Sequence, residues 1–270
     1  MRSIAPSSRN ATIGRRGSPV TPASRAEVAL FDMDRTLVDV HTAKLYLRFQ
    51  RELGEIGAID TLRSSYWLLQ YSMGMVNAEH VALRVLDGYR GKPEVWLRER
   101  CQRWFGSHVL ACVSTVGRAR VRDYQLAGTP VAIATSAIRQ ATQPLAQELA
   151  IPYVVCSELE VDNGILTGCF ERPLCYGDGK LERARALVSS LGASLAQTCF
   201  YTDSITDLPL LEAVGYPVAV NPDLRLRRVA RRRGWPIEEW RKLGTATARA
   251  MASHVESSAP GAPDQRWPQG

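Results

Sequence analysis

A short apolar stretch, Val28–Phe31, is followed at once by two aspartates, Asp32 and Asp34. Four consecutive apolar residues predict a buried β-strand, and the two carboxylates then stand where that strand ends. Burying an unpaired carboxylate is costly or requires a large pKa shift, so two of them at one strand end need a compensating charge. A turn that holds two aspartates by chance is the alternative, because short motifs also match unrelated loops.

Strand-like and helix-like segments alternate along the second half of the chain. Strands are predicted at 131–134, 153–155, 198–201 and 217–220, helices at 116–126, 143–149, 180–191 and 208–214, and a hairpin across 162–164. This alternation predicts an α/β fold, with a parallel sheet covered by helices on both faces. We therefore expect a core of residues 27–41 and 112–242, with a helical block, residues 42–111, inserted after the first strand.

Both ends of the chain are predicted to be disordered. Residues 1–26 contain five arginines and no acid, and residues 243–270 are rich in Ala, Ser, Pro and Gly. The leader lacks an apolar stretch and so is not a secretory signal, although its composition weakly resembles an organelle transit peptide. It also carries +5 of the net charge of +7. The rest of the chain is nearly balanced, so a general nucleic-acid-binding surface is not expected.

The six cysteines form no Cys-x-x-Cys pair and no Cys/His set with metal-ligand spacing. Isolated thiols of this kind are typical of a reducing cytosol. No stretch reaches the roughly 20 apolar residues that a membrane-spanning helix needs. A cytoplasmic protein without a transmembrane segment is therefore expected.

Polar side chains stand where the predicted core strands end. Thr135 and Ser136 follow the second strand, Asp203 and Asp207 follow the strand at 198–201, and Lys180 begins a helix. In a doubly wound sheet these positions meet at one crevice. Facing carboxylates attract a divalent cation, for which oxygen ligands favour Mg²⁺, while a lysine and a hydroxyl suit a phosphate dianion. One carboxylate can then attack phosphorus, and a second can transfer the proton.

Residues 27–240 resemble the haloacid dehalogenase superfamily, and specifically its phosphoserine-phosphatase-like branch, subfamily IB. The four family motifs occur in order, as Asp32-Met33-Asp34-Arg35-Thr36, Thr135-Ser136, Lys180 and Asp203-Ser204-Ile205-Thr206-Asp207-Leu208-Pro209. The resemblance implies a modified Rossmann core with an inserted helical cap that closes over the site. It also implies a Mg²⁺-dependent phosphomonoester hydrolase that acts through an aspartyl-phosphate.

The resemblance assigns the acidic residues to catalysis and metal binding. It implies that Asp32 is the nucleophile and a Mg²⁺ ligand, and that Asp34 is the general acid and base and gives its backbone carbonyl to the metal. Asp203 would complete the metal shell. Asp207 would either contact the metal through water or orient Lys180. As an ordinary structural alternative, Asp207 is a first-turn acid of the helix that follows it.

The resemblance assigns phosphate binding to Thr135 through its hydroxyl, to the backbone N–H of Ser136 and to Lys180. Each assignment has a structural alternative. A hydroxyl after a strand, such as that of Thr135, is often only a helix cap. A lysine at a helix start is usually a solvated surface residue, although the helix dipole disfavours a cation there.

Three positions depart from the family pattern. Arg35 stands where Gly or Ser is common, and is either an added phosphate contact or a surface residue. His41 stands where phosphoserine phosphatases have a glutamate that reads the substrate ammonium, which argues against phosphoserine as substrate. Thr206 replaces a typical Asn and can still donate one hydrogen bond.

The substrate is expected to be a small phosphorylated metabolite or a lipid head-group phosphate. The lipid alternative rests on apolar and aromatic residues of the insertion, which are more typical of plain packing: Tyr66, Trp67, Leu68, Leu69, Tyr71, Met73 and Met75. A phosphotransferase or mutase would use the same aspartyl-phosphate. A catalytically silent RNA- or phosphate-binding module would explain the six arginines in 225–233, for which a solvated helix is the plainer account. The oligomeric state and the pathway stay open.

Overall fold

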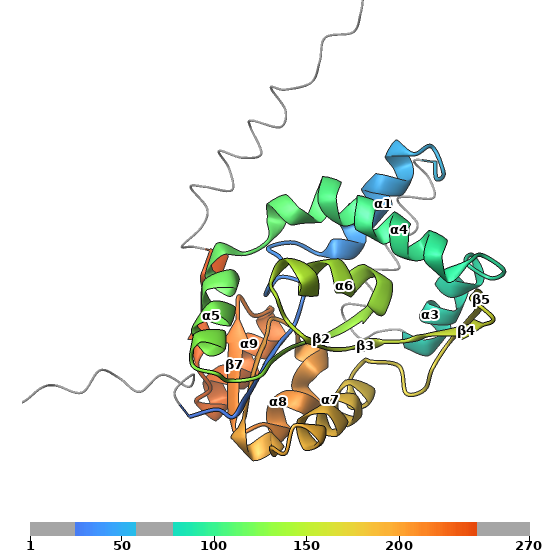
Figure 1. Cartoon of the computed structure of the whole chain (residues 1–270). Helices are drawn as coiled ribbons and strands as arrows, with labels where there is room; N and C mark the ends of the chain where they lie inside the picture. The colour runs from blue at the N-terminus through green and yellow to red at the C-terminus, as the bar shows by residue number, and fades with distance from the viewer. Residues whose placement is uncertain (1–24, 58–77, 242–270) are drawn as a thin grey trace, which may run out of the picture.

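The computed structural model describes residues 25–57 and 78–241 (Figure 1). Its centre is a six-stranded sheet in the order β3-β2-β1-β6-β7-β8, in which every neighbouring pair is parallel. The strands are β1 (Val28–Phe31), β2 (Val131–Ile138), β3 (Tyr153–Ser157), β6 (Thr198–Thr202), β7 (Tyr216–Val220) and β8 (Ile237–Glu238). This is the strand order of a doubly wound Rossmann sheet, so the predicted α/β fold class is confirmed.

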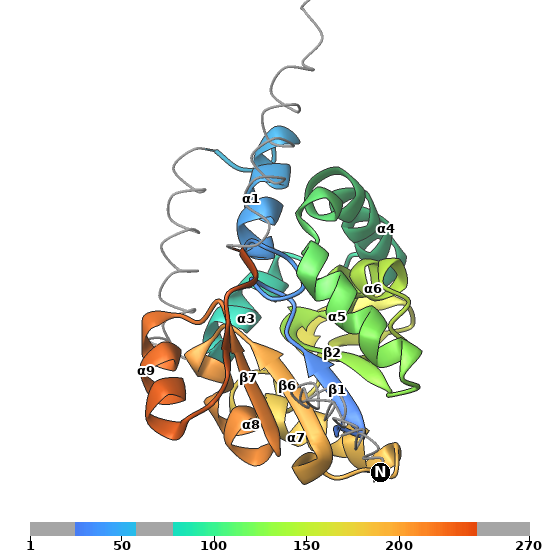
Figure 2. The same ribbon diagram turned by 90° about the vertical axis from the view of Figure 1, so that its left-hand side faces the viewer.

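Helices cover both faces of this sheet (Figure 2). One face packs against α5 (Thr115–Leu126) and α6 (Arg139–Glu148), and the other against α7 (Asp178–Ser190), α8 (Leu208–Ala213) and α9 (Leu224–Arg233). Side chains alternate along β1, so Ala29 and Phe31 enter the first core while Val28 and Leu30 enter the second. Burial on both faces explains why this strand is a continuous apolar run.

The described part of the insertion after β1 is mostly helical. It contains α1 (Thr42–Glu52), α3 (Ala78–Asp87) and α4 (Glu94–Trp104), followed by a π-helix (Phe105–Val109) and a 3₁₀ turn (Leu110–Cys112). The apolar residues at 66–75 that suggested a lipid groove lie outside the described residues, as do positions 1–24 and 242–270 of the expected disordered ends. Ala26, which the expected leader includes, is buried.

The predicted hairpin is present as β4 (Leu159–Asp162) and β5 (Ile165–Phe170). Its two turn residues, Asn163 and Gly164, both have positive φ angles, as a tight two-residue hairpin turn requires. The hairpin packs against the insertion: Leu166 belongs to the same buried cluster as Leu86 of α3 and Leu97 of α4. The hairpin and the two helices thus share a small core, to which Leu174 also contributes.

Two features of the sheet differ from the sequence prediction. Strand β2 continues to Ile138 instead of ending at Ala134, and its register with β3 shifts between those two residues. Thr135 and Ser136 therefore lie within this irregular stretch of the strand, not in a loop after it. The short edge strand β8 was not predicted, because two residues carry too little pattern to identify a strand.

The arginine run forms α9, which is the helix expected at that position. Leu226 and Ala230 anchor it to the sheet, while Arg227 pairs with Glu239 and Arg233 pairs with Glu212. In the described part of the chain, no helix has both the length and the apolar character to span a membrane.

Candidate active site

Asp32 and Asp203 lie side by side because they follow directly on two neighbouring strands. The strands β1 and β6 are paired in register, with Phe31 opposite Tyr201. The backbone N–H of Asp32 continues this ladder by donating to the carbonyl of Tyr201 at 2.8 Å. Both aspartate side chains are almost fully buried. The carboxyl ends of adjacent parallel strands thus hold two carboxylates at the crevice where such sheets bind ligands.

A buried lysine joins Asp32 to a third carboxylate, that of Asp207. The Lys180 ammonium lies 3.0 Å from Oδ1 of Asp32 and 2.7 Å from Oδ1 of Asp207, and its side chain is 3% exposed. The Thr202 hydroxyl donates to Oδ2 of Asp207 at 2.6 Å. Both oxygens of Asp207 therefore have partners within the protein, and one of these is Lys180, as its lysine-orienting alternative requires.

Burial and the charges of neighbouring groups shift the pKa values of Asp32 and Lys180. Burial raises the pKa of Asp32 to about 7, although Lys180 opposes the shift, and Asp207 adds to it. Burial alone would lower the pKa of Lys180, but the charges of Asp207 and Asp32 outweigh this effect and raise that pKa above its usual value. The two carboxylates thus favour the charged form of Lys180.

Lys180 reaches this position because α7 begins unusually close to the preceding loop. Gly177, just before the helix, has a φ of 54°, a backbone conformation that glycine adopts readily. At Gly179, a Cβ atom would lie 2.0 Å from the carbonyl oxygen of Leu174. A side chain at position 179 would therefore push the first turn of α7, and Lys180 with it, away from the sheet.

We expect Gly179→Ala to destabilise the protein by about 1–3 kcal/mol, the usual range for an overpacked site, and to lower kcat by displacing Lys180. Denaturant unfolding and steady-state kinetics measure the two effects. Gly106→Ala is the matched control, because a Cβ at Gly106 meets nothing within 4 Å. Equal stability and activity of the two variants would contradict this account of the helix start.

The second aspartate of the first motif is held by the helix that follows it. Oδ1 of Asp34 accepts hydrogen bonds from the Thr42 backbone N–H at 3.1 Å and from the Thr42 hydroxyl at 2.7 Å. His41 Nδ1 lies 3.8 Å from Oδ2 of the same carboxylate. The start of α1 thus fixes the orientation of Asp34, and this role of Thr42 was missed because no short motif signals a contact across a loop.

Arg35, whose role the sequence left open, contacts the site. Its Nη1 lies 3.1 Å from Oδ2 of Asp203, so it is part of the site rather than a plain surface residue. Burial, followed by the Asp32 charge, raises the pKa of Asp203 well above its usual value, and Arg35 opposes that shift.

The expected phosphate-binding residues on β2 make local contacts. The Thr135 hydroxyl accepts from the backbone N–H of Ala137 at 3.2 Å, and the Ser136 carbonyl accepts from the Ser157 hydroxyl at 2.9 Å. Within residues 25–57 and 78–241, neither is hydrogen-bonded to Asp32 or Lys180. The structure therefore links Asp32, Asp207 and Lys180 directly, and places Thr135 and Ser136 on the strand beside β1.

The donor set suits a hard divalent cation. Across the described segments, no group of three or more His, Cys, Asp or Glu side chains is arranged as a metal cage. Mg²⁺ does not need such a cage, because it keeps several waters and takes one or two protein carboxylates. Asp32 and Asp203 provide two, and their pKa values are raised first by burial and then by neighbouring carboxylates, a combination that a bound cation would offset.

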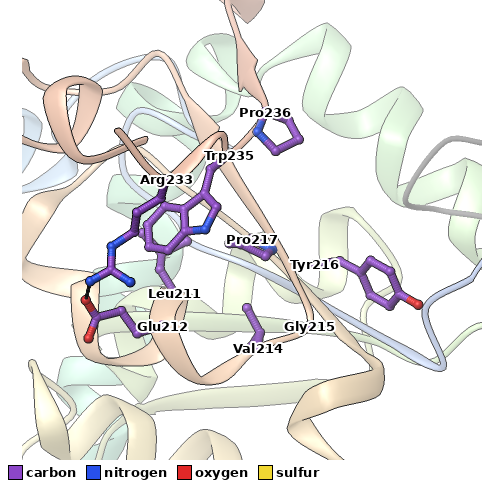
Figure 3. A pocket seen from close by; sticks show the side chains of 9 residues that line it. All are labelled: Leu211, Glu212, Val214, Gly215, Tyr216, Pro217, Arg233, Trp235 and Pro236. Atoms are coloured by element: carbon purple, nitrogen blue, oxygen red, sulfur yellow. Dashed lines mark hydrogen bonds and ion pairs between the residues drawn. The ribbon is translucent and has the colours of Figure 1, made fainter. Parts of the chain in front are cut away.

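A pocket of about 350 Å³ lies elsewhere, at the amino end of β7 (Figure 3). The Arg233 guanidinium sits 5.3 Å from the ring centre of Trp235 and pairs with Glu212 beside it. The pocket contains none of the aspartates discussed above and lies at the opposite end of the strands from them. The chemistry of the motifs therefore belongs to the carboxyl ends of the strands.

Comparisons with known proteins agree with this geometry. A family model for haloacid dehalogenase-like hydrolases matches residues 29–212. The inhibition of morphological differentiation protein of Streptomyces azureus is 30% identical over 79% of this chain and 78% of its own. The histidinol-phosphatase of Neisseria meningitidis is 26% identical over 78% of this chain and 97% of its own. Phosphoserine phosphatase SerB1 of Mycobacterium tuberculosis is 28% identical over 86% of this chain and 79% of its own.

A crystal structure of a protein of unknown function from Bordetella pertussis superposes with a TM-score of 0.71 at 27% identity, covering 79% of this chain and 98% of that one. The match of the family model over most of the chain confirms the resemblance drawn from the four motifs. The chain therefore belongs to the haloacid dehalogenase-like hydrolases, and it is a phosphoserine-phosphatase-like hydrolase of phosphoric monoesters.

Proposed function

We propose that the protein is a Mg²⁺-dependent phosphatase that forms an aspartyl-phosphate on Asp32. The observation that carries this proposal is the buried contact between Lys180 and Asp32, at 3.0 Å, beside the carboxylate of Asp203. Lys180 engages one oxygen of Asp32, which leaves the other for attack on phosphorus. Asp32, Asp203 and the backbone carbonyl of Asp34 would hold Mg²⁺, which when bound would neutralise charge on the carboxylates and on the phosphate.

In the first step, the Asp32 oxygen forms a bond to phosphorus as the bond to the leaving oxygen breaks. Asp34 donates its proton to that leaving oxygen, and an alcohol departs. Water then attacks phosphorus, Asp34 takes one proton from this water, and the bond to Asp32 breaks to release phosphate. The two hydrogen bonds from Thr42 support this role because they hold the Asp34 carboxylate in one orientation.

Lys180 is proposed to bind the phosphoryl oxygens while it restrains Asp32, and Asp207 is proposed to position Lys180. Thr135 and the Ser136 backbone N–H would bind further phosphoryl oxygens from the strand next to β1. The support for this part is the parallel pairing of β1 with β2, which brings the two carboxyl ends together.

The inserted segment, residues 42–111, is proposed to be a cap that excludes water during the first transfer. Its first helix, α1, begins at Thr42, whose hydroxyl donates a hydrogen bond to Asp34. The cap and the proposed general acid are therefore in direct contact. The domain division into residues 27–41 and 112–242 for the core follows from this proposal.

The proposed substrate is a small phosphate ester. The names of two relatives, a histidinol-phosphatase and a phosphoserine phosphatase, differ in substrate and do not select one. His41 lies near Asp34 and offers no carboxylate for a substrate ammonium, which supports substrates other than phosphoserine. A cytoplasmic location is part of the proposal and is supported by the six free cysteines.

We expect the purified protein to hydrolyse members of a panel of amino-acid, sugar, nucleotide and lipid head-group phosphates in Mg²⁺. Removal of divalent cations with EDTA is expected to abolish hydrolysis, and excess Mg²⁺ to restore it, because the buried carboxylates otherwise repel the phosphate. Adding an alcohol acceptor separates a phosphatase from a phosphotransferase, which would form a new ester. Full activity in EDTA would refute the metal dependence.

A further inference from the structure

The guanidinium of Arg35 is bonded to a residue that the proposed function assigns to the metal. Its Nη1 lies 3.1 Å from Oδ2 of Asp203, and the Asp203 side chain is 5% exposed. Among the described residues, this guanidinium is the cation paired with Asp203. A buried carboxylate of this kind requires a compensating charge, and here an arginine supplies it.

The loop holds Arg35 in a conformation that directs its side chain toward the site. Its φ is 55°, in the left-handed region that L-residues rarely adopt. The Arg35 N–H donates to the Val40 carbonyl at 3.3 Å, and the Arg35 carbonyl accepts from Nδ2 of the buried Asn221 at 3.2 Å. Glycine would adopt this backbone without strain, whereas arginine adopts it at a cost in conformational energy. We attribute this cost to the contact that the arginine side chain makes with Asp203.

The fixed charges of the site divide into two groups. Lys180 serves two carboxylates, Asp32 and Asp207, and is paired with both. Asp203 is ion-paired with Arg35 instead, and Arg241 lies near enough to interact electrostatically with both. Arg35 therefore provides Asp203 with charge compensation of the kind that a divalent cation would also provide.

Lys180 and Arg35 differ in how easily each side chain can move away from its carboxylate partner. The Lys180 side chain is 3% exposed and is held between two acids, whereas that of Arg35 is 24% exposed and has one partner in the described chain. A long, partly exposed arginine can rotate into solvent at little cost, because its charge is then hydrated. Arg35 is thus the replaceable cation of the site.

We propose that Arg35 occupies the Asp203 carboxylate of the metal-free protein and must be displaced when a divalent cation binds. This inference rests on the proposed function, because it requires Asp203 to be a metal ligand. Arg35 then stabilises the metal-free protein and weakens its affinity for the cation, both by occupying an oxygen and by repelling a like charge. The cation requirement of this enzyme is therefore set partly by a residue outside the ligand set.

The test is calorimetric titration of MgCl₂ into metal-free protein, a readout independent of turnover. We expect Arg35→Gln to lower the Kd for Mg²⁺ by about tenfold, and Arg35→Lys, which keeps the charge, to remain close to the wild type. In EDTA, Arg35→Gln is expected to melt at a lower temperature and to gain more from added Mg²⁺. Arg35→Gly, which relieves the left-handed backbone, is a second neutral variant and is expected to show the same tighter binding.

The matched control is Arg118→Gln, which removes the same charge from an exposed ion pair with Glu148. Its Mg²⁺ affinity is expected to equal that of the wild type. Equal or weaker Mg²⁺ binding by both neutral Arg35 variants would overturn the inference and leave the proposed function standing. Absence of Mg²⁺ binding by the wild type would instead overturn the proposed metal site, and this inference with it.

Discussion

Asp32→Asn is expected to lower kcat by at least about a thousandfold while the protein stays folded. The amide has nearly the shape of the carboxylate but cannot attack phosphorus, and it removes one member of the pair with Lys180. Steady-state kinetics with an aryl phosphate measure the loss, and thermal unfolding verifies the fold.

Asp123→Asn is the matched control for this substitution, because Asp123 is an exposed residue of α5 on the same domain. Its kcat is expected to match that of the wild type. If Asp32→Asn retained turnover within about tenfold of the wild type, Asp32 would not be the nucleophile.

Lys180→Met is expected to lower both stability and turnover, because it leaves Asp32 and Asp207 buried without a cation. Breaking a buried pair by removing one partner typically costs about 3–5 kcal/mol, and the loss of the phosphate-binding ammonium should lower kcat/KM by at least about a hundredfold. Denaturant unfolding and steady-state kinetics provide the two measurements. Lys44→Met, at an exposed position of α1, is the matched control.

A double variant separates the two roles of Lys180. Adding Asp207→Asn to Lys180→Met removes one of the two stranded carboxylates, so part of the lost stability is expected to return. Turnover is expected to stay low, because the phosphate contact is still missing. Recovery of turnover in the double variant would contradict phosphate binding by Lys180.

The sequence predicted the core well because its signals are local. Val28–Phe31 is apolar on both faces, so a buried strand was the natural interpretation, and the Asn163–Gly164 pair identified the hairpin. The juxtaposition of Asp32 with Asp203 was also predictable, because both follow strands that a parallel sheet aligns. Their catalytic roles stay predictions.

The rest depends on contacts that no local pattern encodes. Thr42 bonds to Asp34 across a seven-residue gap only because the loop after β1 bends back on itself. The predicted strand at 198–201 stopped one residue before Thr202, and the bond from Thr202 to Asp207 forms only once the following 3₁₀ turn is in place. Arg35 contacts Asp203 across 168 positions of sequence, a pairing that requires the complete sheet.

The most direct test of the central claim is to locate the phosphoryl group on the enzyme. Protein mixed with an excess of aryl phosphate and Mg²⁺ is quenched in acid during turnover, digested and examined by peptide mass spectrometry. The account predicts one added phosphoryl group on the peptide that contains Asp32, and none in Asp32→Asn. A phosphoryl group on another residue, or fully active enzyme from which no phosphorylated peptide can be trapped, would contradict it.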